Sequence, residues 1–288
     1  MLIPVDGLFA LAPTLESGQT FRWRRSGDVF EGVVFGNVVK VRQADDGVEF
    51  TCGPDDGKYL APLLSDYLGL ATDLPAVYRS MSHDPRVSEA IDRYRGMRIL
   101  RQDPWECLVC FICSSASNIP RISRNVEDLC ASFGRPILVE GTPRRAFPTP
   151  HELAEAGERR IFELGLGYRA AYLAKTAGAV ADGAVDLMSL REEAYGDALV
   201  ALTSLDGVGD KVANCVMLFS LDQTSAFPVD VWIKRALQEW YSDAGVNKMS
   251  LPKMRLWAQE YFGEYAGYAN QYLFHDRRLL GRGVTAGA

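Results

Sequence analysis

The sequence has no long hydrophobic run. Its longest uncharged stretch, from Leu108 to Pro120, becomes polar at Ser114, whereas a membrane-spanning helix needs about 18 or more apolar residues. We therefore expect no transmembrane helix and no membrane partner. No basic residue precedes Arg22, so the chain does not start like a positively charged secretory leader, and we expect an intracellular protein.

Other features are scarce or absent. The lack of repeats and low-complexity segments excludes a solenoid and argues against a disordered chain. The three histidines are far apart, so they suggest no zinc site. The six cysteines are expected to be free thiols in a reducing compartment. Cys107, Cys110 and Cys113 are spaced like cluster ligands, but they lie in an apolar helical pattern. We therefore interpret them as helix packing and expect no iron–sulfur cluster.

The composition is that of an ordinary globular protein. Of the 288 residues, 48% are hydrophobic and 24% are charged, and this length suggests about two domains. The 37 acidic residues outnumber the 31 basic ones, so the formal net charge is −6. This charge lowers the expectation of a nucleic-acid partner without excluding one, because phosphate binding depends on local positive charge.

The spacing of apolar residues changes along the chain. Between residues 21 and 52, apolar and polar residues alternate around turns such as Gly36-Asn37, which predicts antiparallel hairpins with one exposed face. From residue 105 to 279, apolar residues recur every three or four positions, which predicts helices joined by short loops. We expect an α+β protein, with an antiparallel sheet domain and flanking helices in residues 1–100 and an all-helical domain in residues 101–288.

Two predicted helices meet at the segment Leu205-Asp206-Gly207-Val208-Gly209. A helical hairpin of this kind exposes backbone N–H groups at a helix start, where the peptide dipoles favour a phosphate. A glycine-containing turn that binds nothing is an equal alternative. Lys211 follows in the first turn of the second helix, where a cation is disfavoured by about 0.3–1 kcal/mol. Taken alone, it is best interpreted as a solvated surface lysine.

Asp230 follows Pro228 and precedes another apolar helical pattern. Its simplest role is therefore that of an N-cap. The loop before it is long enough to bring Asp230 back beside Lys211. A neutral amine next to a carboxylate would make a nucleophile with an electrostatic partner.

Several further motifs accompany this hairpin, and together they identify a resemblance. The Leu-x-Gly-Val-Gly-x-Lys hairpin is followed, nineteen residues after its Lys, by the Asp of Pro-Val-Asp-Val. In order along the chain there are also Ser-Gly-Gln-Thr-Phe-Arg-Trp from residue 17, Leu-Arg-Gln-Asp-Pro-Trp-Glu-Cys from residue 100, Phe-Ile-Cys-Ser-Ser from residue 111, and Leu-Gly-Leu-Gly-Tyr-Arg-Ala from residue 164. The chain resembles the 8-oxoguanine DNA glycosylase family of helix-hairpin-helix base-excision glycosylases over most of residues 15–280. The fold that this implies is a sheet domain like the TATA-binding protein followed by a helix-hairpin-helix domain.

The resemblance implies a bifunctional DNA glycosylase and AP lyase of base excision DNA repair, which flips 8-oxoguanine out of duplex DNA and excises it. Lys211 matches the amine that attacks C1′ and forms a Schiff base, which can eliminate the 3′-phosphate. Asp230 matches the carboxylate that stabilises positive charge on the sugar. The resemblance further implies a monomer without a required cofactor, located with the DNA in a nucleus or nucleoid, and we favour the bacterial cytoplasm.

The resemblance also assigns a pocket for the damaged base. Gly18 matches the glycine whose carbonyl accepts the N7 hydrogen that 8-oxoguanine has and guanine lacks. Cys215 and Phe274 match the two sides between which the flipped base stacks. Asn270 stands where relatives have the glutamine that contacts the lesion's edge, and Gln271 is its neighbour. For each residue alone, a turn glycine or core packing is the simpler interpretation.

Contacts with the opposite base and the backbone follow in the same way. Tyr168 matches the wedge that fills the gap, while Arg121 and Arg169 match donors to the opposite cytosine. Ala116 stands where better-known members have the first of three Asn residues, of which Asn118 is retained. We therefore expect a preference for cytosine with a smaller margin than in those members.

The hairpin glycines and one replaced residue complete the set of DNA contacts. Gly207 and Gly209 would approach the phosphates. Trp232 stands where eukaryotic members have a His, and that histidine's Asp partner falls at Arg277, so we interpret the two changes as coordinated. The carbonyls expected to bind a bridging cation are those of Thr203, Leu205 and Val208.

Two alternatives stay open. One is a glycosylase of the same superfamily for another damaged purine, such as an alkylpurine enzyme, which would be monofunctional and lack a Lys at position 211. The other is a non-catalytic helix-hairpin-helix module that binds only the DNA backbone. Borohydride trapping separates both from an amine-based lyase.

Overall fold

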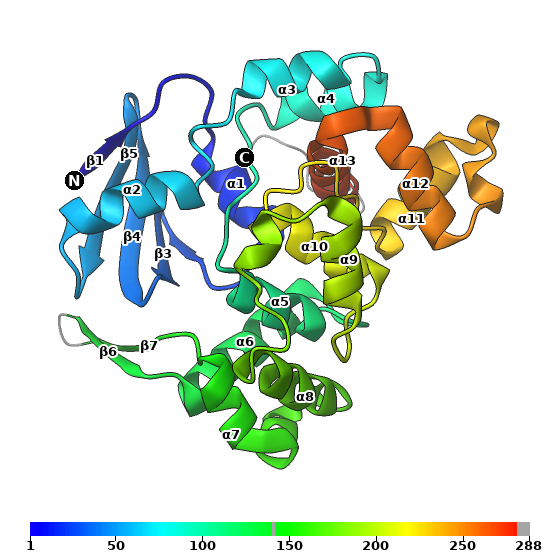
Figure 1. Ribbon diagram of the computed structural model, residues 1–288. Coiled ribbons are helices and arrows are strands. Elements are labelled where there is room, and N and C mark those ends of the chain that lie inside the picture. Colours follow the sequence, from blue (N-terminus) through cyan, green and yellow to red (C-terminus); the bar gives the residue numbers. More distant parts are fainter. Residues whose placement is uncertain (140–141, 281–288) are drawn as a thin grey trace.

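The computed structural model describes residues 1–139 and 142–280, with a sheet on one side and helices on the other (Figure 1). The five-stranded sheet is antiparallel, and its strand order is β1-β5-β4-β3-β2. Val39 and Val41 of β4 are buried, while Lys40 and Arg42 between and after them are exposed. The hairpins predicted from the alternating pattern are therefore confirmed. The strands are β1 (Leu2–Pro4), β2 (Arg24–Ser26), β3 (Val29–Val34), β4 (Asn37–Ala44) and β5 (Gly47–Gly53).

The buried face of the sheet packs against α1 (Leu11–Glu16) and α2 (Gly57–Tyr67). Phe50 of the sheet shares a core with Leu60 and Leu64 of α2. Asp56 begins α2 as its N-cap, because its side chain accepts a hydrogen bond from the backbone of Lys58. The sheet and these two helices therefore form the first core of the molecule.

The next two helices, α3 (Leu74–Met81) and α4 (Pro85–Arg93), belong to the second core. Their buried residues, such as Met81 and Ile91, pack with the helical part of the chain, and α4 contacts α13 (Ala266–Leu280). Leu100 then returns to the core of the sheet. The chain thus crosses between the two cores more than once, and the domain boundary near residue 100 stays a prediction.

A short β-hairpin interrupts the part of the chain in which we expected only helices. It consists of β6 (Pro136–Val139) and β7 (Thr142–Arg145), and Ile137 packs against Val33 and Val38 of the sheet. The expectation was wrong here because a four-residue strand is too short to show a period. The prolines and glycines around it suggested a loop.

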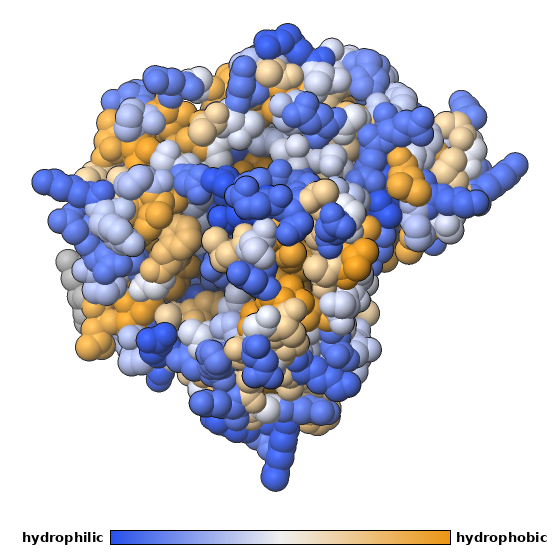
Figure 2. Space-filling view, in the orientation of Figure 1, coloured by the Kyte–Doolittle hydropathy of each residue, from blue (hydrophilic) through white to orange (hydrophobic). Residues whose placement is uncertain are grey.

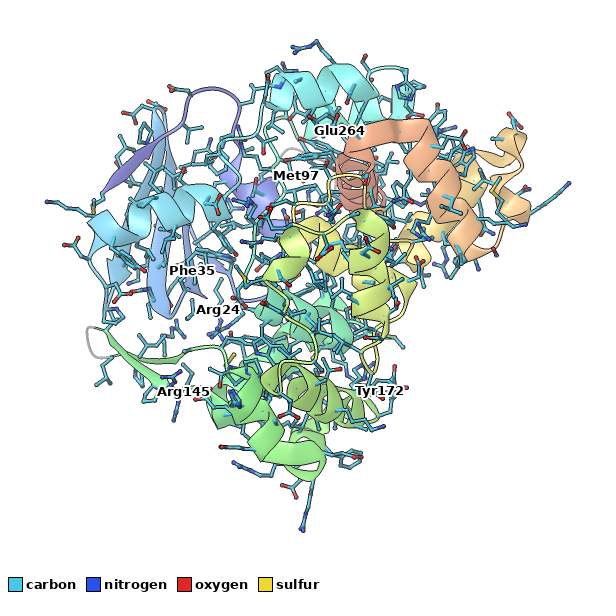
Figure 3. All side chains as sticks on the ribbon, in the orientation of Figure 1. Arg24, Phe35, Met97, Arg145, Tyr172 and Glu264 are labelled. Carbon is cyan, nitrogen blue, oxygen red and sulfur yellow. The ribbon has the colours of Figure 1, made fainter. Side chains whose placement is uncertain are left out.

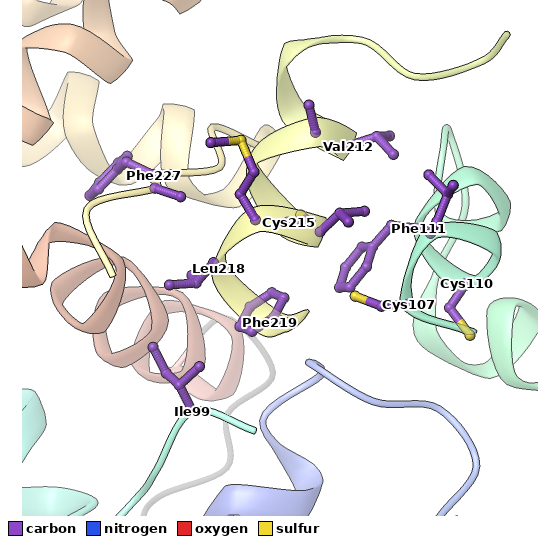
Figure 4. Close-up of a cluster of buried hydrophobic side chains, with 14 of the residues drawn as sticks. Ile99, Cys107, Cys110, Phe111, Val212, Cys215, Leu218, Phe219 and Phe227 are labelled. Carbon is purple, nitrogen blue, oxygen red and sulfur yellow. The ribbon is translucent and has the colours of Figure 1, made fainter. Parts of the chain in front are cut away.

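The remaining helices build the second core around α10. In this core Phe111 of α5 stacks on Phe219 of α10 with centroids 5.5 Å apart, and Cys107 and Cys215 lie nearby (Figure 4). The helices are α5 (Pro104–Cys113), α6 (Ile119–Phe133), α7 (Pro150–Ile161), α8 (Arg169–Ala181), α9 (Tyr195–Thr203), α10 (Asp210–Ser220), α11 (Val231–Trp240), α12 (Leu251–Phe262) and α13.

The three cysteines of α5 are all buried, so their interpretation as helix packing is confirmed. Burial raises the pKa of the Cys113 thiol to about 12, which keeps it neutral near pH 7. Within residues 1–139 and 142–280, no helix is long and apolar enough to cross a membrane. The face seen in Figure 2 carries hydrophilic and hydrophobic residues side by side, and the side chains that project at its edges are mostly hydrophilic.

Candidate active site

The predicted hairpin is formed by α9 and α10, which are joined by residues 204–209. Gly207 has a φ of +78°, and a Cβ added to it would lie 2.7 Å from Cβ of Tyr172 in α8. A glycine is therefore required there both by conformation and by space. Figure 3 shows Tyr172 at the surface of the helical region, and the same α8 helix reaches the turn again through Thr176, whose hydroxyl donates to the Asp206 carbonyl (2.8 Å).

The start of α10 is open. Its N-cap is Gly209, which has extended backbone, and a Cβ added to it would meet nothing within 4 Å. No side chain among the described residues caps this end of the helix. The first backbone N–H groups of α10 are thus available to an anion, and phosphate binding here stays a prediction.

A polar network that sequence reasoning missed holds the hairpin. The buried Arg255 of α12 pairs with Asp210 at 3.0 Å. Asn214 donates to the Asp210 carbonyl (2.8 Å) and accepts from the backbone N–H of Phe227 (3.1 Å). The network therefore connects the first turn of α10 to the loop that leads to Asp230. A polar Asn214 within an otherwise apolar helical run was the one signal in the sequence.

Lys211 is partly buried and points toward α5. Its Nζ donates to Oγ of Ser114 (2.7 Å) and lies 5.0 Å from the centroid of the Phe111 ring. Ser114 immediately follows α5, and its contact with Lys211 was not predicted from the sequence. The interpretation of Lys211 as a simple solvated surface lysine is therefore wrong.

Asp230 is the N-cap of α11, as predicted, because it accepts a hydrogen bond from the backbone N–H of Ile233 (2.8 Å). Burial raises the pKa of the Asp230 carboxyl, while the Ile233 bond and the nearby Lys211 lower it. Asp230 thus returns close enough to Lys211 for the two charges to interact. The Ile233 hydrogen bond thus favours the ionised carboxylate, while burial acts against it.

Cys215 lies one helical turn after Lys211 on α10. Burial raises the pKa of its thiol to about 11, although Lys211 acts in the opposite direction. Near pH 7 the thiol is therefore neutral. It offers a soft, polarisable surface rather than a second nucleophile.

The Gly18 segment meets α13 on the other side of the site. Gly18 has a φ of +85°, and an added Cβ would lie 3.0 Å from Cδ1 of Ile119 and 3.3 Å from Cε1 of Phe274. The Gln271 side chain donates to the Ser17 carbonyl (3.2 Å). The structure therefore brings together three of the predicted pocket residues, Gly18, Gln271 and Phe274.

Asn270 points elsewhere. It is buried, and its amide donates to the Pro228 carbonyl (3.0 Å). Its neighbour Gln271 reaches Ser17 instead, so consecutive residues of α13 fasten the loop before Asp230 and the segment before Gly18. Asn270 thus has a structural partner, and its predicted contact with the base edge stays a prediction.

The residues predicted to face the opposite base differ in exposure. Tyr168 is 54% exposed, as a wedge must be, and Arg121 is exposed in the first turn of α6. Asn118 is the N-cap of α6 and accepts from the backbone N–H of Arg121 (3.0 Å). These placements are compatible with DNA contacts and do not test them.

Arg169 has hydrogen-bond partners within the protein, and its contact with the opposite base stays a prediction. It is only 3% exposed, and its guanidinium donates to the carbonyls of Ser115 (2.8 Å), Ala116 (3.1 Å) and Leu166 (3.2 Å). These bonds use its donors to hold the loop after α5. A contact with the opposite base would first have to break them, because an Arg has only five N–H donors.

Trp232 and Arg277, which we interpreted as coordinated replacements, lie on α11 and α13. Arg277 forms an ion pair with Glu239 and lies 5.3 Å from the ring of Trp240. Trp232 is partly buried near the start of α11. The coordinated change at the two positions therefore stays a prediction.

Metal binding has little support among side chains. Within the described residues, no group of three or more His, Cys, Asp or Glu is arranged to hold a metal ion. The carbonyls of Thr203, Leu205 and Val208 lie at the hairpin, and that of Leu205 accepts from the Val208 N–H (3.2 Å). A cation at these carbonyls stays a prediction.

Comparison with known proteins establishes the family. A model described as the N-terminal domain of 8-oxoguanine DNA glycosylase matches residues 2–108, and one described as an HhH-GPD superfamily base excision DNA repair protein matches residues 109–258. The N-glycosylase/DNA lyase OGG1 of Arabidopsis thaliana is 37% identical over 275 residues, covering 91% of this chain and 75% of that protein. The chain belongs to the 8-oxoguanine DNA glycosylase family.

Other relatives agree with this assignment. The N-glycosylase/DNA lyase of Saccharomyces cerevisiae is 33% identical, covering 92% of this chain and 82% of that protein. The 8-oxoguanine glycosylase/lyase of Clostridium acetobutylicum, solved with duplex DNA containing cytosine opposite 8-oxoG, superposes with a TM-score of 0.88 at 33% identity, covering 95% and 93% of the two chains. This member of the family is therefore a DNA-repair enzyme of the N-glycosylase/DNA lyase type, and its fold is that of the family.

Proposed function

We propose that this enzyme excises 8-oxoguanine from duplex DNA by flipping the base and attacking the sugar with Lys211. The observation that supports the proposal is the Lys211 amine, held beside Asp230 and one turn from Cys215. Gln271 and Asn270 of α13 join this side of the site to the Gly18 segment. A flipped base would occupy the space between the two sides.

The chemistry follows from these groups. The lone pair of the neutral Lys211 amine forms a bond to C1′, and the glycosidic bond breaks with its electrons leaving on the base, which takes up a proton. Asp230 stabilises the positive charge that develops on the sugar. Loss of a proton from the amine and opening of the sugar ring then give a Schiff base. Removal of a C2′ proton from this species expels the 3′-phosphate.

Recognition of the lesion would depend on one hydrogen bond. The positive φ of Gly18 sets the direction of its carbonyl, next to the ring of Phe274. 8-Oxoguanine carries a hydrogen on N7 and guanine does not, so only the lesion satisfies a carbonyl facing that position. An unsatisfied carbonyl penalises the normal base.

The duplex would be held by the exposed Tyr168 and Arg121 and by the open start of α10. A phosphate at this helix start would benefit from the free N–H groups and the helix dipole. We propose that the protein works as a monomer with the DNA inside the cell, which is compatible with its six free cysteines.

The test is single-turnover excision from duplexes containing 8-oxoguanine, guanine or an alkylated purine. We expect release of 8-oxoguanine alone. Lys211→Gln should keep lesion binding and lose both excision and strand cleavage. Lys175→Gln is a matched control, since Lys175 is an exposed lysine paired with Asp206 near the same hairpin. Undiminished excision by Lys211→Gln, or release of the alkylated purine instead, would overturn the proposal.

A further inference from the structure

We propose that Ser114 is a positioning residue that aims the Lys211 amine. The inference rests on the proposed function, because it concerns how the nucleophile is held. Its basis is the 2.7 Å hydrogen bond from Lys211 Nζ to Ser114 Oγ, which joins α10 to the end of α5. Nothing in the sequence motif alone assigns this contact.

The direction of the Ser114 hydroxyl is fixed by a second bond. Its hydrogen is donated to the carbonyl of Phe111 at 2.6 Å. A hydroxyl has one hydrogen and two lone pairs, so the oxygen can only accept from Lys211. Ser114 is therefore a pure acceptor toward the amine.

The surroundings of this contact are rigid. Phe111, over which the Nζ lies, stacks on Phe219 and packs edge-on against Phe21 with centroids 5.6 Å apart. Ser114 itself is the C-cap of α5, whose residues other than Glu106 are all buried. The oxygen is thus held in place by the packed core.

A fixed acceptor matters because of the shape of an amine. A neutral Lys211 has two N–H bonds and one lone pair in tetrahedral directions, and rotation about Cδ–Cε and Cε–Nζ otherwise samples several staggered positions. Donation of one N–H to Ser114 removes most of these positions and turns the lone pair away from α5. Attack on C1′ requires such alignment.

A purely structural role for Ser114 predicts different behaviour. Its bond to Phe111 resembles that of Ser82, the C-cap of α3, whose hydroxyl donates to the Arg79 carbonyl at 2.9 Å. Ser82→Ala therefore reports the cost of losing a capping hydroxyl far from the amine. If capping were the whole role of Ser114, both Ala variants would lose only stability.

The experiment compares Ser114→Ala, Ser114→Thr and Ser114→Val in single-turnover excision, borohydride trapping, DNA affinity and thermal unfolding. We expect Ser114→Ala to lower the excision rate and the rate of trapping about tenfold or more while DNA affinity is unchanged. Threonine keeps the hydroxyl and valine replaces it with a methyl group of similar size. The Thr variant should therefore exceed the Val variant by a similar factor, even if both are less stable.

Equal rates for the Thr and Val variants, or a wild-type rate for Ser114→Ala, would overturn the role of Ser114. If Lys211→Gln is inactive in the same assay, the failure of the Ser114 role leaves the proposed function intact. If Lys211→Gln still excises the base, the proposed function itself fails.

Discussion

Gly18 combines a backbone constraint with a spatial one. At a φ of +85° any side chain is strained, and a Cβ would also press on Ile119 and Phe274. We expect Gly18→Ala to lower excision of 8-oxoguanine by roughly a hundredfold, because it displaces both the carbonyl and one wall of the base pocket. Single-turnover excision measures the loss of activity, and urea unfolding measures the loss of stability.

Gly36 offers the matched control. Its φ is +75°, but a Cβ there would meet nothing within 4 Å. Gly36→Ala should therefore lose a similar amount of backbone stability, about 1 kcal/mol, while excision is retained. Equal losses of activity in the two variants would remove Gly18 from the recognition of the lesion.

At the residue scale, the sequence predicts the local roles and misses the remote ones. The N-cap role of Asp230 follows from its position before an apolar helical pattern, and the structure confirms it. The contact between Ser114 and Lys211 spans 97 positions, and that between Asp210 and Arg255 spans 45. No local pattern encodes such pairs, because they depend on how α10 packs against α5 and α12.

At the scale of elements, the loop after α5 is held by hydrogen bonds from Arg169 at the start of α8. Arg169→Met keeps the length of the side chain but removes the donors to the three carbonyls of this loop. We expect the free energy of unfolding to fall by about 2–3 kcal/mol, because buried acceptors lose a charged donor. Chemical denaturation tests this, and Arg159→Met on α7, an exposed arginine with an i,i+4 partner, should change stability by less than about 0.5 kcal/mol.

The same variant decides between the two interpretations of Arg169. If Arg169→Met is as stable as the wild type and loses only its preference for cytosine opposite the lesion, the arginine reads the base. Loss of stability together with poorer insertion of the neighbouring Tyr168 into the duplex would show that Arg169 supports the loop after α5.

The elements themselves were predictable to different degrees. Segments with a clear pattern, such as α10 and the β3–β4 hairpin, were recognised. β4 alternates buried and exposed residues from Val39 to Arg42, and α10 is a long apolar run that is buried from Val212 to Ser220. The β6–β7 hairpin was missed because it buries little beyond Ile137 and Val139. The packing of α3 and α4 in the second core was not predicted, because the sequence of a helix with one apolar face does not show which core that face joins.

At the scale of the whole molecule, His275 makes stability depend on pH. It is buried on α13, where Arg278 donates to its Nδ1 and Tyr94 packs edge-on at 4.5 Å. Burial, with a smaller effect from Arg278, lowers the pKa of His275 to about 3, against about 6.5 for an exposed histidine. The unfolded chain therefore binds more protons between these values, and stability is lost as the pH falls from about 6.5 toward 3.

Glu106 has the opposite effect on the pH dependence of stability, so the test compares single variants with the wild type. Burial raises the pKa of Glu106 to about 7, which makes stability fall as the pH rises from about 4.5 to 7. Between pH 7 and pH 4 the wild type should lose unfolding free energy because of His275. His275→Gln should reduce this loss by about a few kcal/mol. His151→Gln, at an exposed position, should leave the curve unchanged, and an unaltered slope in His275→Gln would contradict the assignment.

The net charge of −6 makes the salt dependence of DNA binding informative. Lys234 and Arg235 on α11 and Arg121 on α6 are exposed, whereas Arg169 is buried. Each phosphate that a basic group neutralises should add about −0.9 to the slope of log affinity against log salt. Lys234→Gln should therefore flatten the slope by roughly that amount, and Lys58→Gln on α2 should not. A flat wild-type response would contradict duplex binding through local basic groups.

The assignment of Lys211 as the nucleophile is tested by identifying the residue that becomes covalently joined to DNA. A duplex with 8-oxoguanine opposite cytosine is incubated with the enzyme and borohydride, and the trapped complex is digested and sequenced by mass spectrometry. We predict one covalent link, at Lys211, and no trapped complex for Lys211→Gln. A link at another lysine, or excision without any trapped complex, would contradict it.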